Sequence, residues 1–326
     1  MRVSEAGSFS VSNEKGVRRG MPFLALILVS LFWGGHAVVG KAVETQLAPL
    51  PLTVWRFTMT AVCCLPLLGR AKRILQLPSR TRWQFVLASL FWSVLYPLCY
   101  YQSLRTISPL ESLLLVNTAP LLAVLFGFLV LRERLTRWEG AGIAVSFAGI
   151  VTLVALQGTG HAELIGIVFA LCASASFAGY TVCSRSLFQA LPLFDVLLAT
   201  SVLGAVLLWI WTLVTGQLDV VAGALATLNQ AGWMQLMYIV LIVSTAAYAL
   251  YGYGLRRLPA AVSSALTFYP QVVFAAVIEW VWLGIVPAVV TWVGAAFILG
   301  GTVLMRIRRR PSQAPSDGCG QSARAE

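Results

Sequence analysis

Apolar stretches of about 20 residues recur along almost the whole chain, and they restrict the possible fold more than any other feature. An α-helix needs ~20 predominantly apolar residues to cross the ~30 Å hydrocarbon core of a bilayer. Only 11% of the 326 residues are charged and 59% are hydrophobic, so too little polar surface remains for a water-soluble domain of this size. The sequence therefore predicts an all-α polytopic membrane protein.

Ten such stretches predict ten transmembrane helices, flanked by polar tails at 1–20 and 306–326. The longest gap between the spans, 215–231, is predicted to be a short loop. The spans are 21–41, 51–69, 83–104, 109–131, 137–156, 164–186, 193–214, 232–255, 259–284 and 287–305.

The distribution of basic residues predicts the orientation of these spans. With ten crossings, every lysine and arginine except Lys41, Arg56 and Arg105 falls on the side of the amino terminus. The positive-inside rule therefore places both termini in the cytoplasm of a multi-pass protein of the cell (inner) membrane. Topology also accounts for the net charge of +11, so we expect no nucleic-acid partner.

The first apolar run ends in FWGGHAVVGK at 32–41, which raises the alternative of a cleaved signal peptide. Residues 35–37 match a small-residue cleavage site poorly, and nine further spans follow. The stretch also has a counterpart in the second half of the chain. We therefore interpret it as part of a transmembrane span with a function.

The second half of the chain repeats the first at a nearly constant offset. Because each repeat holds five spans, an odd number, the halves would cross the membrane in opposite senses, as in transporters that work by alternating access. The first repeat is predicted at 21–156 and the inverted second repeat at 157–305. The aligned pairs include Trp33 with Phe177, His36 with Tyr180, Ser93 with Ser244, Tyr100 with Tyr251, Pro120 with Pro270, Gly142 with Gly294 and Gly149 with Gly301.

Several stretches resemble the drug/metabolite transporter superfamily, and within it the EamA-type ten-span exporters. The resemblance covers roughly 21–305 and implies export of small metabolites, often amino acids, by alternating access. Two positions depart from it: Ile285 stands where family members often carry an acid, and His36 where they often carry asparagine. The stretches are FWGGHAVVGK, LRTISPLESLLLVNTAPLLAVLFGFLVLRERLT, ASFAGYTVCSR, STAAYALYGYGLRRLPAAVSSALTFYP and VGAAFILGGTVL.

Aromatic and polar residues near the middle of the spans predict a cavity for apolar or zwitterionic small molecules. His36 lies too deep for its side chain to reach the membrane surface easily, so it is either a packing residue or a group that binds substrate or protons. We expect about half of the aromatic rings to line the cavity and the others to pack. The cavity candidates are Trp33, His36, Tyr96, Tyr100, Asn117, Phe177, Tyr180, Tyr248, Tyr251 and Tyr269.

Other residues are expected to act as hinges, gates or helix caps. Pro120 and Pro270 each free a backbone carbonyl one turn earlier and are hinge candidates. Lys41, Glu44 and Arg56 are placed at the outer ends of the first two spans, as an outer gate or as residues that reach the membrane surface. Glu111 and Glu139 follow Ser108 and Thr136 at capping-box spacing. Glu279, next to Trp280 and Trp282, is expected near the outer membrane interface.

The leading functional hypothesis is a secondary transporter that exports small metabolites, with amino acids or related apolar or zwitterionic compounds as substrates. The alternative within the superfamily is a transporter of drugs, phosphorylated sugars or nucleotide sugars. A membrane-embedded enzyme and a passive channel are the alternatives of another class, although the sequence has no HExxH or GxSxG motif. We expect no cofactor or metal, proton coupling is an open possibility, and the chain would act as a monomer or homodimer.

Overall fold

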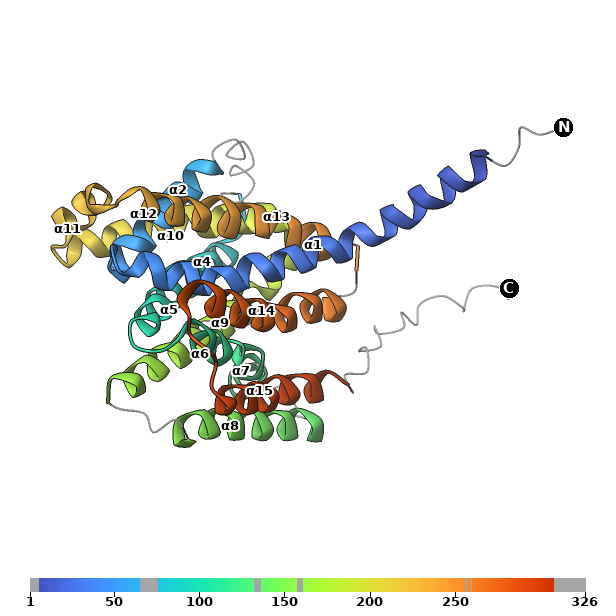
Figure 1. Ribbon diagram of the computed structural model, residues 1–326. Helices are drawn as coiled ribbons and strands as arrows, with labels where there is room; N and C mark the ends of the chain where they lie inside the picture. Colours follow the sequence, from blue (N-terminus) through green and yellow to red (C-terminus); the bar gives the residue numbers. More distant parts are fainter. Residues whose placement is uncertain are drawn as a thin grey trace, which may run out of the picture.

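The computed structural model describes residues 6–64, 76–131, 136–156, 161–255, 257–258 and 260–307, and within these ranges the regular structure is helical, without strands (Figure 1). The first half contains α1 (Ala6–Glu44), α2 (Pro49–Cys63), α4 (Ser79–Ser89), the π-helix η2 (Leu90–Leu95), α5 (Tyr96–Leu104), α6 (Pro109–Val116), α7 (Ala119–Leu131) and α8 (Arg137–Leu156). The second half contains α9 (His161–Ala190), α10 (Leu193–Val214), α11 (Leu218–Gly223), the 3₁₀-helix η3 (Ala224–Thr227), α12 (Gln230–Met237), the π-helix η4 (Tyr238–Ala246), α13 (Ala247–Leu255), α14 (Ala260–Leu283) and α15 (Val289–Ile307).

Each predicted span coincides with one helix or with consecutive helices. Among the described residues, seven segments are long and apolar enough to cross a membrane, which agrees with a multi-pass membrane protein. The count of ten spans and the cytoplasmic location of the termini stay predictions. One expectation was wrong: the gap at 215–231 is not a plain loop, because it holds α11 and η3.

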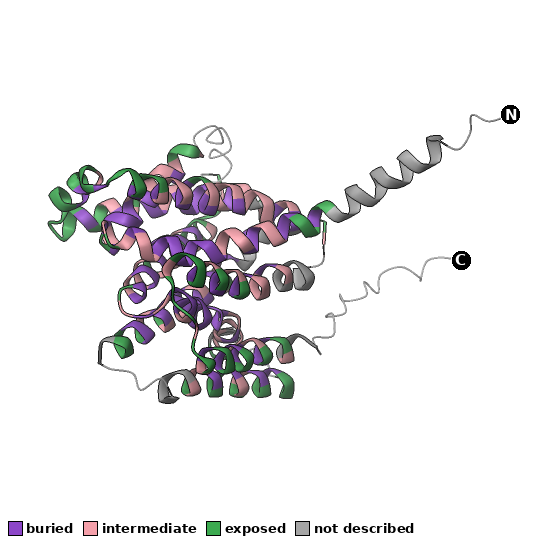
Figure 2. Ribbon diagram, in the orientation of Figure 1, coloured by how far each residue is buried: buried purple, intermediate pink, exposed green. Residues whose placement is uncertain are grey.

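Contacts between the two halves come in pairs that the repeat relates to each other. Helix α1 packs on α14 of the other half, and its counterpart α9 packs on α6 and α7. In the same way α1 contacts α13 while α9 contacts α5, and α2 contacts η4 while α10 contacts η2. The halves are therefore interleaved, and the buried residues gather where they meet (Figure 2).

Helices α8 and α15, the last helix of each half, form an antiparallel pair beside the rest of the bundle (Figure 1). A β-carbon at Gly301 would lie 2.5 Å from the carbonyl oxygen of Gly142, and one at Gly149 would lie 3.0 Å from that of Gly294. These two contacts are equivalent, because Gly142 aligns with Gly294 and Gly149 aligns with Gly301 in the repeat. The α8–α15 pair is therefore related by an internal twofold axis, as inverted repeats require.

Both halves contain a π-helix at the same place, immediately before α5 and before α13. The two segments, η2 and η4, include the aligned residues Ser93 and Ser244. Ser93 donates to the carbonyl oxygen of Thr200, and Ser244 accepts from Arg56. Short π-helical segments are rare and frequently lie at functional sites. Here they shift the direction of the side chains that follow them in both repeats.

The fourth predicted span is broken, whereas its counterpart in the second half is continuous. Helix α6 ends at Val116, a turn contains Asn117 and Thr118, and α7 begins at Ala119. Pro120 cannot donate to the carbonyl of Val116, and the hydroxyl of Ser174 in α9 lies 3.4 Å from that oxygen. Helix α14 instead runs through Pro270 without a break. The expected freed carbonyl is thus present at Pro120, and α9 supplies its partner.

Candidate functional site

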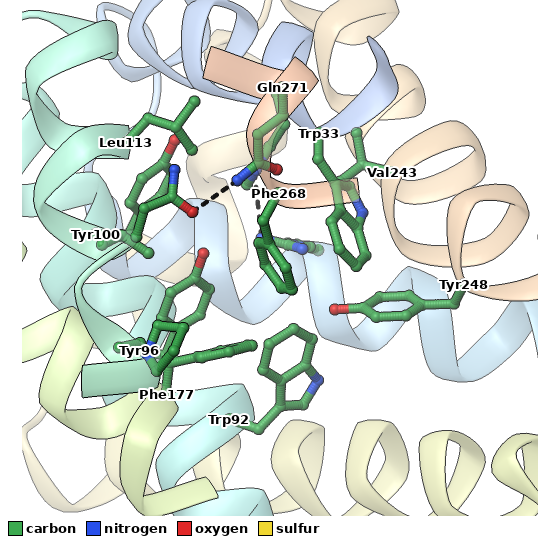
Figure 3. Close-up of a pocket in the computed structure, with 16 residues that line it drawn as sticks. Trp33, Trp92, Tyr96, Tyr100, Leu113, Phe177, Val243, Tyr248, Phe268 and Gln271 are labelled. Carbon is green, nitrogen blue, oxygen red and sulfur yellow. Dashed lines mark hydrogen bonds between the residues drawn. The ribbon is translucent and has the colours of Figure 1, made fainter. Parts of the chain in front are cut away.

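A cavity lies between the two halves at the centre of the bundle, and both halves line its wall (Figure 3). Helices α1 and α2, η2, and α5 to α7 contribute from the first half, and α9, η4, α13 and α14 from the second. Its lining is mostly aromatic and aliphatic, which is typical of small-molecule sites. The lining residues are Trp33, His36, Arg56, Trp92, Tyr96, Tyr100, Leu113, Val116, Asn117, Ala119, Pro120, Phe177, Val243, Tyr248, Phe268 and Gln271.

The FWGGHAVVGK stretch reaches the cavity because its first glycine lets two helices approach closely. A β-carbon at Gly34 would lie 2.7 Å from the carbonyl oxygen of Gln271, so α1 and α14 touch along their backbones. Small residues permit such close packing between membrane helices. The neighbouring side chains of Trp33 and His36 then line the cavity.

The aromatic rings of the wall contact one another from different helices. Trp92 stacks on Tyr96 with ring centroids 5.4 Å apart, and it contacts Tyr248 edge to face at 5.5 Å. Trp33 lies 5.6 Å from Tyr248 and 6.2 Å from Phe268. Figure 3 shows these rings converging on one space from both sides. Aromatic contacts of this kind make a wall that is apolar and well defined in shape.

Arg56 does not lie at the end of its helix, contrary to the prediction from the sequence. Helix α2 begins at Pro49 and ends at Cys63, so Arg56 is in the middle of the helix and not at its outer end. Its side chain is only 3% exposed, and it lines the central cavity. The assignment of Arg56 to an outer gate with Lys41 and Glu44 was therefore wrong.

A hydrogen-bond network connects Arg56 to three other helical segments. Its Nη1 donates to the hydroxyl of Tyr101 at 2.9 Å, and its Nε donates to the hydroxyl of Ser244 at 3.0 Å. The Nε2 of His36 lies 3.0 Å from the Tyr101 hydroxyl and 3.4 Å from Nη1 of Arg56. With the hydroxyl of Tyr101 donating to Nε2, the imidazole is an acceptor in this arrangement. His36, Arg56 and Tyr101 thus form one buried unit.

A second cavity shares part of its wall with the first. Arg56, Trp92 and Tyr248 line both, and the second extends toward the end of α2 at Cys63 and Cys64. The predicted topology places that end of α2 on the cytoplasmic side. Arg56 therefore stands where the central cavity meets a space that leads toward one side of the bundle.

The predicted cavity residues divide into two groups. Seven of them line the central cavity: Trp33, His36, Tyr96, Tyr100, Asn117, Phe177 and Tyr248. Tyr180 and Tyr251 lie behind it, since Tyr180 stacks on Trp92 at 5.0 Å and Tyr251 contacts Trp33 at 5.5 Å. Tyr269 is not part of the lining, although the adjacent Phe268 is. Of the two hinge candidates, Pro120 lines the cavity and Pro270 does not.

Lys41 and Glu44 lie together at the predicted outer end of α1, where they hold the turn between α5 and α6. Lys41 donates to the carbonyl oxygen of Leu104, and Glu44 forms an ion pair with Arg105 at 3.0 Å. Glu279 of α14 also reaches this turn, because its Oε2 accepts from the backbone N–H of Leu110 at 2.9 Å.

Glu111 and Glu139 cap helices, whereas Glu279 packs inside the bundle. The capping box of Ser108 and Glu111 is confirmed at the start of α6, and Thr136 and Glu139 form the same pair of bonds at α8. Glu279 lies in the last turns of α14, at its predicted outer end, and its side chain is only 1% exposed because it packs against the start of α6. The flanking Trp280 and Trp282 are exposed, as a membrane interface requires.

Several residues of the site were not found from the sequence. Trp92 of the wall lies in the π-helix η2, and Tyr101, which contacts the wall residues Arg56 and His36, lies in α5 directly after it. An ordinary helical period therefore does not indicate which way these two rings point. Gln271 donates to Asn117 at 2.9 Å across the two halves, a contact without a local sequence signal. A signal did exist for Arg56: it is the only charged residue between Leu50 and Cys64.

Comparison with known proteins places the chain among membrane transporters. The profile of the EamA-like transporter family matches twice, at residues 20–155 and 164–307. These two matches correspond to the two halves of the fold. A solved crystal structure aligns with 87% of this chain and 96% of its own, with a TM-score of 0.57 and 21% sequence identity. At that identity the likeness concerns the fold alone.

Similar proteins of named organisms are transporters by description. An uncharacterized transporter of Bacillus subtilis, YwfM, is 24% identical over 86% of this chain and 92% of its own. A probable terminal-alkyne amino-acid exporter of Streptantibioticus cattleyicolor is 30% identical over 62% of this chain and 67% of its own. A probable amino-acid metabolite efflux pump of Salmonella typhimurium is 24% identical over 72% of this chain and 78% of its own.

Proposed function

Because the chain belongs to the EamA-like transporter family, we propose that it is a secondary transporter that exports small metabolites by alternating access. Its substrates would be amino acids or related apolar or zwitterionic compounds. The observation that carries this proposal is the central cavity, whose wall is shared by both halves of the repeat. A site between two such halves is exposed first to one side and then to the other when the halves move relative to each other.

The proposal includes a location and an orientation. The protein would reside in the cell (inner) membrane with ten spans and both termini in the cytoplasm. The antiparallel contact of the equivalent helices α8 and α15 supports opposite orientations of the two halves. The positive-inside distribution of basic residues supports the cytoplasmic termini.

Two observations support an amino-acid-like substrate. The relatives from Streptantibioticus cattleyicolor and Salmonella typhimurium are described as a probable exporter and a probable efflux pump for amino acids or their metabolites. In addition, the cavity combines aromatic rings with few polar groups, which suits a small molecule with an apolar body. A phosphorylated sugar would need several cations around its phosphate. Among the described lining residues, Arg56 alone carries a permanent charge.

The test is transport by the purified full-length protein in liposomes. Labelled aromatic and aliphatic amino acids are offered with and without a pH gradient, and phosphorylated sugars serve as the control class. We expect saturable amino-acid uptake that is accelerated by unlabelled substrate on the opposite side. Uptake without saturation or acceleration would contradict a carrier and indicate a channel, and uptake of phosphorylated sugars alone would contradict the substrate class. A response to the pH gradient would establish proton coupling.

A further inference from the structure

Arg56 is a buried cation, and none of the described carboxylates lies beside it. In the described part of the chain, no aspartate or glutamate oxygen lies within 4.0 Å of its guanidinium. A charged side chain in a membrane protein is costly to bury and is normally paired. Arginine also cannot lose its proton under ordinary conditions. The positive charge of Arg56 therefore persists inside the bundle, and its protein neighbours are neutral hydroxyl and imidazole groups.

The neighbours of Arg56 use only part of its hydrogen-bonding capacity. Its Nε donates to Ser244, and its Nη1 donates to Tyr101. Within the described residues Nη2 has no hydrogen-bond partner. It is nevertheless accessible, because it is absent from the buried polar atoms that lack a partner. Because the guanidinium carries five N–H donors in a planar fork, one end of this fork is available to a ligand. Ser244 and Tyr101 hold the rest of the group in place.

The described part of the surrounding wall has no group that would neutralise a ligand's positive charge. No aspartate or glutamate occurs among the described residues that line the two cavities. The hydroxyl of Tyr100 and Nδ2 of Asn117 have no partner in the described chain, but both atoms are sealed from the cavity space, unlike Nη2 of Arg56. Trp33, Trp92, Phe177 and the other rings surround the remaining space. The site thus offers a ligand one positive charge and aromatic faces.

From this arrangement we propose that the cavity selects monoanionic carboxylates with an aromatic or bulky apolar body, and that Arg56 binds the carboxylate group. A carboxylate matches the guanidinium fork geometrically, and one fixed positive charge balances one negative charge. The body of the ligand lies among the rings. An amino group on the ligand is not required, so the substrates extend from amino acids to aromatic carboxylates that lack one. This inference rests on the proposed transport function and names the substrate class of the same cavity.

Three ligands that differ by one charged group test the proposal on the unmodified protein. L-Phenylalanine has both charged groups, 3-phenylpropionate has only the carboxylate, and phenethylamine has only the ammonium group. Equilibrium binding to the purified full-length protein in detergent is measured with each labelled compound. We expect 3-phenylpropionate to bind within roughly tenfold of phenylalanine and phenethylamine to bind at least about tenfold more weakly, since charged hydrogen bonds contribute that much to affinity. Phenethylamine binding as well as 3-phenylpropionate, or no binding of either carboxylate, would overturn the proposal.

Substitutions then assign the effect to one residue. Arg56→Gln should weaken binding of 3-phenylpropionate at least about tenfold, and Arg56→Lys should retain part of it because the charge remains. The matched control is Arg82→Gln, since Arg82 is exposed on α4 and contacts neither cavity. Size-exclusion profiles and thermal unfolding identify variants that do not fold. If folded Arg56→Gln binds 3-phenylpropionate normally, Arg56 does not hold the carboxylate.

The two proposals can fail separately. If liposomes transport phenylalanine but 3-phenylpropionate neither binds nor competes, the transport function stands and the carboxylate inference fails. If 3-phenylpropionate binds through Arg56 but no ligand shows counterflow, the inference stands and the transport function fails.

Discussion

The Nη1 of Arg56 in α2 lies 2.9 Å from the hydroxyl oxygen of Tyr101 in α5 and donates a hydrogen bond to it. The same hydroxyl lies 3.0 Å from Nε2 of His36 in α1. Tyr101 is fully buried, so its oxygen has no access to solvent that could replace these partners. One hydroxyl group therefore fixes the direction of an arginine and of a histidine that both line the cavity.

Replacing Tyr101 by phenylalanine should impair transport without unfolding the protein. The ring stays, but Nη1 of Arg56 and Nε2 of His36 both lose their shared partner, and the guanidinium is free to turn away from the ligand. We expect KM for the transported amino acid to rise by roughly tenfold, because a hydrogen bond to a charged group contributes about that factor to an equilibrium constant. The control is Tyr253→Phe, because Tyr253 does not line either cavity. An unchanged KM in Tyr101→Phe would show that Arg56 is held by other contacts.

His36 is tested by comparing two substitutions. Glutamine can accept the hydrogen bond from Tyr101 through its amide oxygen, whereas alanine cannot. We expect His36→Gln to transport better than His36→Ala, with both expressed at normal levels. If His36 instead carries protons, both variants should lose any response to a pH gradient in liposomes. Full transport by both variants would assign His36 to packing alone.

Adjacent glycines in α15 provide a matched test of the α8–α15 contact. A β-carbon at Gly301 would lie 2.2 Å from Oγ of Ser146, whereas one at Gly300 would meet nothing within 4 Å. We expect Gly301→Ala to destabilise the folded protein by about 1–3 kcal/mol, the usual range for overpacking. Gly300→Ala should leave stability unchanged or raise it slightly. Thermal unfolding in detergent measures both, and equal melting temperatures would refute the close contact.

Pro120 should matter for the transport cycle more than for binding. An alanine at this position supplies the N–H that the carbonyl of Val116 lacks, so the break between α6 and α7 would be replaced by a continuous helix. We expect Pro120→Ala to lower the maximal transport rate while ligand affinity is retained. Pro109→Ala is the control, since a proline at the first helical position has no intrahelical bond to restore. A normal rate in Pro120→Ala would exclude a hinge there.

The helices and the repeat were predictable from the sequence because both depend on patterns that extend over many residues. Hydropathy located a helix at each predicted span, and pairs such as Gly142 with Gly294 indicated the repeat before any contact was known. The capping boxes at Ser108 and Thr136 were predictable for a similar reason, since each is complete within four residues.

The depth of Arg56 and the direction of Tyr101 were not predictable in the same way. The depth of Arg56 depends on where α2 begins and ends, and the predicted span, 51–69, differed from the observed helix, Pro49–Cys63, at both ends. The direction of Tyr101 depends on the π-helix η2, which changes the helical phase without a sequence signal. The bond from Gln271 to Asn117 joins residues of different halves and required the packed structure.

The hydroxyl of Ser146 in α8 donates to the carbonyl oxygen of Ile298 in α15, and these two residues occupy aligned positions of the two repeats. A pair of aligned residues that touch lies on the twofold axis, so the two residues would stay neighbours if the halves exchanged their conformations, as the proposed transport cycle requires. The α8–α15 pair can therefore keep one geometry throughout such an exchange. It would act as a stationary frame, and the strain of each conformational switch would fall on the helices around the cavity.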